Sequence, residues 1–450
     1  MTKWKLSRRS FLEGTAAVAV GGATFGRARG AFAAGRLSVG FWDHWVPGAN
    51  DYLTRLAKEW AEKEKVDLQI DYIPSQGNKD LLTIQAESQA HSGHDILTFR
   101  TWEASSHAED LEPVDDVMKE VLASNGRTNP VVEYLAHQNG RWIAVPATPG
   151  SQIKGPCSRL DLMKQHAGID VVAMYPGDGP TNQELAKNWT FDTFLAAAEK
   201  CFKAGVPFGI GLGTTSDSID SVGAIFNAFG AQLVDEKGEI TVRSEATLKA
   251  LDYMKRLSAF LPPDVIAWDD ASNNRWLISG KGALVFNPPS AWAVAKRDAP
   301  QVAEKCWTHP MPAGPKGRFA PYLPFNWGIW SFSKNKSAAK SLLAHLSTKE
   351  AIAQFVEGSQ GYDIPGYEAL HAFPAWAEQG PPKGTLRHYP IVPGEETYSI
   401  AASPAPPKIA VQVYSQATVT KMVGRMMQNG DTPEKAVAWA ESELEGFLRT

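Results

Sequence analysis

The segment LSVGFWDHW (37–45) decides the fold, together with the predicted strands VDLQIDY (66–72) and DILTF (95–99) that follow it. In each of the first two segments, apolar residues alternate with polar or small ones, as on a strand with one buried face. Between the three strands, apolar residues recur every three or four positions over 52–60 and cluster again over 81–86, which predicts two helices. This strand–helix order predicts a parallel sheet covered by helices.

The same alternation continues further along the chain. Thr190, Ser244 and Thr432 are placed to cap helices, because their side-chain oxygens can accept from a free backbone N–H. Residues 206–212 and 282–286 are predicted strands. Since 450 residues exceed the size of one domain, we predict an α/β protein of two lobes, each a mostly parallel sheet flanked by helices.

Residues 1–33 are predicted to be a twin-arginine signal peptide. Basic residues that include Arg8 and Arg9 precede a mildly apolar stretch, and Ala31-Phe32-Ala33 matches a cleavage site. Removing six basic residues and one acidic residue changes the formal net charge from −4 to −9. The mature chain is therefore not expected to bind nucleic acid or an anionic membrane, and a periplasmic location is predicted. With only three cysteines, an exported chain keeps at least one thiol unpaired within itself.

Catalytic signatures are largely absent from the sequence. It contains no H-E-x-x-H, G-x-S-x-G or G-x-x-x-x-G-K-[ST] pattern. His91, His94 and Asp95 could ligate a metal, but a solvated turn is the favoured interpretation, and no metal or cofactor is expected.

The predicted ligand site lies where aromatic and polar side chains follow strands. Ligands of open α/β sheets bind beyond the carboxyl ends of the strands, and a sugar offers apolar faces to an indole and hydroxyls to polar groups. The chain has 15 tryptophans, about half of which we expect in the core. The candidate ligand-binding residues are Trp42, Asp43, His44, Trp45, Gln76, Trp102, Glu103, Trp268, Asp269, Asn287, Trp292, Asn326 and Trp327.

The chain resembles the extracellular solute-binding proteins of ABC importers, in the group that binds sugars and related solutes. The resemblance is carried by NGRWIAVP (139–146), WTFDTF (189–194), SGKGALV (279–285), PAGP (312–315) and SKNK (333–336). It covers nearly the whole mature chain. The segment KGPCSRL (154–160) departs from the family pattern and puts in doubt a tyrosine contact expected from the second lobe.

The resemblance implies a two-lobe clamshell with three crossings, placed near Pro146, Phe286 and Asn326. It assigns residues 36–146 plus 287–326 to the N-terminal lobe and 147–286 plus 327–450 to the C-terminal lobe. It also implies a monomer without catalysis that passes a sugar or oligosaccharide to permease subunits in the membrane. A polyol, polyamine or other small solute is the alternative ligand, and an exported glycosidase is the disfavoured alternative activity.

Overall fold

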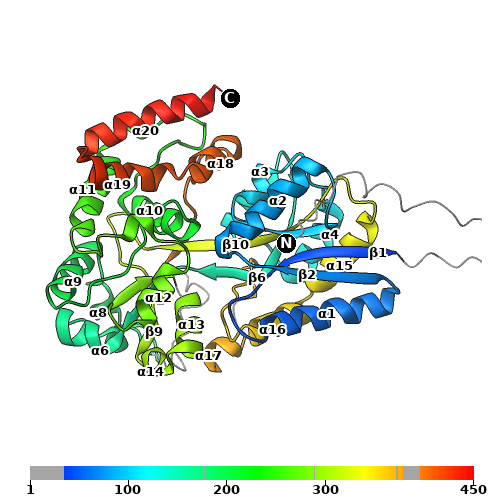
Figure 1. Cartoon of the computed structure of the whole chain (residues 1–450), viewed down its shortest axis with the longest axis horizontal. Coiled ribbons are helices and arrows are strands. Elements are labelled where there is room, and N and C mark those ends of the chain that lie inside the picture. Colours follow the sequence, from blue (N-terminus) through cyan, green and yellow to red (C-terminus); the bar gives the residue numbers. More distant parts are fainter. Residues whose placement is uncertain (1–34, 177–178, 288, 371–372, 379–395, 450) are drawn as a thin grey trace, which may run out of the picture. The chain divides into compact units, whose positions relative to one another are not determined.

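The computed structural model describes residues 35–176, 179–287, 289–370, 373–378 and 396–449 (Figure 1). The predicted signal peptide lies outside these residues. The described residues form two lobes, one with a six-stranded sheet and one with a three-stranded sheet, and a separate two-stranded sheet is formed by residues 137–138 and 141–142.

The first sheet has six strands and is mixed. The three strands predicted first in the chain lie side by side, because β1 pairs in parallel with both β2 and β3. Strand β10 then joins β3 and β6 in antiparallel fashion, and β11 pairs in parallel with β10. The strands are β1 (Arg36–Trp42), β2 (Asp67–Ile73), β3 (Ile96–Arg100), β6 (Val145–Ile153), β10 (Phe319–Ile329) and β11 (Thr397–Ser399).

Helices from both ends of the chain cover this sheet. Helix α1 contacts α15 and α16, and α15 also contacts α4 (Figure 1). Leu53, Leu56 and Trp60 form the buried face of α1, which confirms the helix predicted there. The helices are α1 (Ala49–Glu64), α2 (Lys79–Ala90), α4 (Asp115–Asn125), α15 (Lys336–Leu346) and α16 (Lys349–Gly358).

The second sheet has three strands in the order β8-β7-β9, with bounds β7 (Pro156–Arg159), β8 (Leu284–Phe286) and β9 (Cys306–Thr308). Both neighbours of β7 are antiparallel to it, so the parallel arrangement expected for each lobe does not extend to this sheet. The strand predicted over 206–212 contributes only one isolated bridge, between Gly209 and Val285. The Trp276 ring packs so close to Gly209 that a β-carbon there would lie 2.3 Å from it.

Five longer helices pack together in the second lobe. The predicted caps are confirmed: Thr190, Ser244 and Thr432 each accept from a backbone N–H three residues further on. Phe194 and Leu251 lie within the same core cluster. The helices are α9 (Phe191–Lys203), α10 (Ser216–Phe229), α11 (Glu245–Ser258), α19 (Thr418–Asn429) and α20 (Pro433–Leu448).

Shorter elements connect these layers. They are α3 (Glu103–Ser106), α5 (Pro130–Ala136), α6 (Leu160–Leu162), α7 (Val171–Met174), α8 (Gln183–Ala186), α12 (Ser272–Ile278), α13 (Ser290–Asp298), α14 (Pro300–Ala303), α17 (Ala375–Glu378), α18 (Pro407–Ser415), β4 (His137–Gln138) and β5 (Arg141–Trp142).

The predicted residue limits of the lobes stay a prediction, but four packing contacts bear on them. Helices α15 and α16 contact α1, although 327–450 was assigned to the C-terminal lobe. Helix α13 contacts α12, and β9 pairs with β7, although 287–326 was assigned to the N-terminal lobe.

Candidate functional site

A cleft with two hollows lies between elements of the two lobes. The smaller hollow, of about 20 Å³, is lined by residues that include Trp42, Trp45 and Gln152. The larger hollow, of about 520 Å³, is lined by α2 and α3 on one side and by α18 and the start of α10 on the other. Arg100, Ser216 and Asp270 line both hollows. We call these three residues the waist of the cleft.

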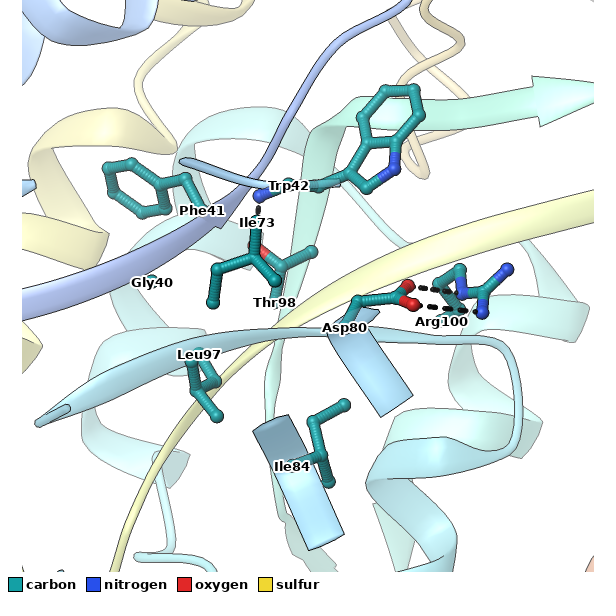
Figure 2. Close-up of a pocket in the computed structure, with 9 residues that line it drawn as sticks. All are labelled: Gly40, Phe41, Trp42, Ile73, Asp80, Ile84, Leu97, Thr98 and Arg100. Carbon is teal, nitrogen blue, oxygen red and sulfur yellow. Dashed lines mark hydrogen bonds and ion pairs between the residues drawn. The ribbon is translucent and has the colours of Figure 1, made fainter. Parts of the chain in front are cut away.

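Arg100 is the centre of the waist. It ends β3, and its Nε lies 2.7 Å from Oδ2 of Asp80, while its Nη2 donates to Oδ1 at 3.2 Å (Figure 2). Its Nη1 lies 3.7 Å from Oδ2 of Asp270 and donates to Oγ of Ser216 at 3.5 Å. Burial raises the pKa of Asp80, and Arg100 only partly opposes this effect. The guanidinium therefore links a carboxylate of the first lobe to polar groups of the second lobe.

A second buried ion cluster adjoins the smaller hollow. Lys154 follows β6, is completely buried, and has its Nζ at 2.9 Å from both Asp217 and Asp220 on α10. Burial alone would lower the pKa of Lys154, but the two carboxylates outweigh burial and raise it. Burial raises the pKa of Asp217 to about 6 against the opposing effect of Lys154, and Asp270 adds to the rise. Carboxylates thus outnumber cations around the cleft.

Two buried polar atoms beside the cleft lack a hydrogen-bond partner within the described part of the chain. They are Nε1 of Trp42, an N–H donor, and Oε1 of Gln152, an acceptor. Both residues are only 5% exposed and both line the smaller hollow. An unsatisfied buried polar group costs about 1–3 kcal/mol, so both atoms favour a polar ligand or water in this hollow.

Four of the predicted site residues line the cleft. Trp42, Trp45 and Asn287 lie at the smaller hollow, and Glu103 lies at the larger one. Trp42 also lines a minor hollow behind β1, where its backbone N–H donates to Oγ1 of Thr98 (Figure 2). The segments after β1 and β3 are therefore brought together.

Four further predicted residues lie near the cleft but do not line it. Asp43 accepts from Asn50, and Nε2 of His44 lies 3.0 Å from Oδ1 of Asp363. Gln76 is exposed, although its neighbour Ser75 lines the smaller hollow. Asp269 accepts from Ser272 and Arg275, so its carboxylate holds the turn before α12.

The remaining five predicted residues are buried in the protein. Trp102 and Trp327 are each 1% exposed, and the indole N–H of Trp102 donates to the carbonyl of Ala401. Trp268 packs against Trp276. These contacts favour the core interpretation of the tryptophans. The buried set is Trp102, Trp268, Trp292, Asn326 and Trp327, and its contact with ligand stays a prediction.

Of the charged residues of the cleft, sequence analysis selected Glu103 but missed the others. Arg100, Lys154, Asp217 and Asp270 come from four separate segments, and only their folded arrangement joins them. A signal did exist for Arg100, because it directly follows the strand predicted over 95–99. No comparable signal preceded α18, whose Gln412 and Tyr414 line the larger hollow.

Other site types find little support in the residues that the structure describes. They include no group of three metal-ligating side chains, and His94 is instead bonded to Glu87 and Asp71. None of their helices is both long and apolar enough to cross a membrane. Cys157, Cys201 and Cys306 are buried free thiols.

Solved structures of low sequence identity share the fold. A maltose-bound MalE3 of T. maritima has a TM-score of 0.72 at 19% identity, with 91% of this chain and 99% of that chain covered. The GacH receptor of Streptomyces glaucescens has a TM-score of 0.70 at 20% identity, with coverage of 92% and 99%. A sugar transporter from Arthrobacter chlorophenolicus with bound laminaribiose has a TM-score of 0.71 at 15% identity, with coverage of 92% and 99%. A search of curated proteins found no match.

A family model also matches the sequence directly. The model of the bacterial extracellular solute-binding proteins matches residues 46–353, which is more than half of the chain. This range contains the segment after β3, the ion clusters of Arg100 and Lys154, and the waist of the cleft. The two lobes and the cleft between them agree with that match, and the chain belongs to the bacterial extracellular solute-binding proteins.

Proposed function

We propose that this protein is the substrate-binding component of an ABC importer and that it captures a sugar or oligosaccharide in the cleft. The main support for this proposal is the cleft, where Trp42 and Trp45 lie beside polar groups. Two of its buried polar atoms, Nε1 of Trp42 and Oε1 of Gln152, have no hydrogen-bond partner among the described residues. An indole stacks on the apolar face of a sugar ring, and the polar groups bond its hydroxyls. Three structures with the same fold were solved with maltose, acarbose or laminaribiose bound.

A binding screen with a matched pair of variants tests this proposal. We expect mono- and oligosaccharides from a panel to raise the melting temperature and to give saturable calorimetric binding. Trp45→Ala should weaken the binding by about thirtyfold, or about 2 kcal/mol, because it removes an aromatic wall of the cleft. Trp439→Ala, on α20, removes a tryptophan of similar partial burial outside the cleft and should leave affinity unchanged. Binding of polyols or diamines without binding of any sugar would contradict the proposal.

We further propose that the protein acts as a monomeric carrier in the periplasm and that it hands its ligand to permease subunits without converting it. Members of this family are solute-binding proteins. Arg8 and Arg9 support export by the twin-arginine route. Replacing both with Lys should leave unprocessed precursor in the cytoplasm. Normal periplasmic mature protein from this variant would refute the route.

The packing supports modified lobe limits. We propose that β1–β5 belong to the N-terminal lobe with β10, α15 and α16, while β7–β9 belong to the C-terminal lobe with α9–α14 and α18–α20. Strand β6, paired with β10, would then carry the first crossing. Limited proteolysis should cut between these groups of elements before it cuts within them.

A further inference from the structure

The cleft carries more negative than positive charge on its walls. The charged residues lining the two hollows, apart from histidine, are one cation, Arg100, and three carboxylates, Glu103, Asp217 and Asp270. The layer directly behind them adds Lys154 together with Asp80 and Asp220. Five carboxylates therefore face two cations, which leaves an excess of three negative charges when all are ionised.

The two cations already have partners of their own. Arg100 pairs with Asp80 in a contact whose side chains are both 8% exposed, and Lys154 pairs with Asp217 and Asp220. Glu103 accepts no side-chain hydrogen bond from the residues described here, and it lines the larger hollow. Asp270 lies 3.7 Å from Arg100 and accepts from Ser216 and from the backbone of Asp217, yet its side chain keeps 26% exposure. Both Glu103 and Asp270 thus present carboxylate oxygen to the cleft.

The shape of the cleft separates a site for a small group from a site for a larger body. The smaller hollow, at about 20 Å³, exceeds the minimum of about 10–15 Å³ for one water molecule, and an ammonium group is of similar size. Its walls include Asp217, Asp270 and the unpartnered acceptor Oε1 of Gln152. An ammonium group has three donors and no acceptor, which matches this set of acceptors. The larger hollow, at about 520 Å³, has room for sugar rings.

We propose that the ligand is a sugar bearing a protonated amine, with the ammonium in the smaller hollow between Asp217, Asp270 and Oε1 of Gln152 and the sugar rings in the larger hollow. This inference rests on the proposed function and narrows its ligand class. An ammonium group supplies the missing positive charge, whereas a neutral sugar leaves the carboxylates to repel one another. Charge-assisted hydrogen bonds are roughly twice as strong as neutral ones, so the amine should dominate selectivity.

The test compares sugars that differ only at one nitrogen. Glucosamine, galactosamine and mannosamine, each as monosaccharide and β-1,4-linked disaccharide, are titrated at pH 7.5 against their N-acetylated and hydroxyl counterparts. The best free amine should bind at least about tenfold more tightly than both counterparts, and raised salt should reduce this preference. Equal or tighter binding of the neutral forms would overturn the inference while leaving the proposed function in place. If no sugar of any type binds, the proposed function fails, and the inference fails with it.

Three variants separate charge from structure. Asp270→Asn should lower the amine preference at least fivefold, because it removes a carboxylate that contacts the ammonium. Glu103→Gln should lower the amine preference less than Asp270→Asn does. The Glu103→Gln variant should fold normally, because Glu103 accepts no side-chain hydrogen bond from the described residues. Glu245→Gln removes an exposed carboxylate on α11 and should leave the preference unchanged. An unchanged preference in both Asp270→Asn and Glu103→Gln would overturn the inference.

Discussion

The guanidinium of Arg100, at the end of β3, lies 3.7 Å from the carboxylate of Asp270, which precedes α12 in the other lobe. The same guanidinium forms a buried ion pair with Asp80 on α2. One lobe thus presents a fixed cation, and the other presents a carboxylate that is still partly exposed. Both residues line both hollows, so a ligand in the cleft would reach this link. We therefore expect ligand binding and contact between the lobes to be coupled at the waist.

Removing the cation should destabilise the first lobe. In Arg100→Met, the carboxylate of Asp80 stays buried without its partner, which costs about 3–5 kcal/mol of unfolding free energy. Urea unfolding of the ligand-free protein measures this loss. Arg55→Met breaks an exposed pair with Glu59 and should cost less than about 1 kcal/mol. Equal unfolding free energies of the two variants would show that the buried pair stabilises the fold no more than the exposed pair does.

Asp217 should make stability depend on pH in an unusual direction. Its pKa in the folded protein is about 6 against a normal 3.8, so between these values the folded state binds more protons than the unfolded state. Its contribution is complete below about pH 4 and is lost as the pH rises through 6, by on the order of 3 kcal/mol.

Urea unfolding of Asp217→Asn between pH 4 and 7 measures that contribution. Relative to the variant, the unaltered protein should lose stability as the pH rises. Asp264→Asn, at an exposed position, should run parallel to the unaltered protein. A constant difference between the unaltered protein and Asp217→Asn across this range would contradict the shifted pKa.

Local features of this fold could be predicted from the sequence, and distant pairings could not. The cap at Thr190 and the alternation that produces β1 depend on neighbouring residues, so both were predicted correctly. The antiparallel pairing of β10 with β3 joins segments more than 200 residues apart, and no local pattern encodes it. The waist is the same kind of feature, since Arg100 and Ser216 meet only after both lobes have formed.

Tryptophans illustrate the same limit within the candidate site. Trp42 follows a predicted strand and Trp327 follows a predicted crossing, each beside a polar neighbour, and sequence alone could not separate them. In the structure, Trp327 packs against Phe41 and Phe355 within the core, whereas Trp42 lines the cleft. The two rings differ in which distant segments pack against them, and the residues that flank each tryptophan in the sequence do not determine this.

Trp42 and Trp327 should therefore respond differently to substitution. Trp42→Phe keeps an aromatic ring but removes the N–H that has no partner among the described residues, so sugar affinity should fall about fivefold, or about 1 kcal/mol, at nearly constant stability. Trp327→Ala should cost about 3–5 kcal/mol of stability and leave the affinity of the folded protein unchanged. Calorimetry and urea unfolding on both variants measure the two effects. If Trp327→Ala lost affinity instead and Trp42→Phe lost stability instead, the ligand would lie against Trp327.

Ligand should bring the lobes together without being converted. A ligand shifts the equilibrium between open and closed forms only if it makes better contacts in one of them, and we expect the waist residues, which line both hollows, to supply those contacts in the closed form. Small-angle scattering should thus give a smaller radius of gyration with a saturating sugar than without it. Trp45→Ala, at the same sugar concentration and below its own saturation, should give an intermediate radius.

Sugar recovered after long incubation should have its original mass and linkage, as expected for a carrier. An unchanged radius at proven saturation would contradict closure, and cleaved sugar would instead favour an exported glycosidase, with Glu103, Asp217 and Asp270 as the carboxylates to examine first.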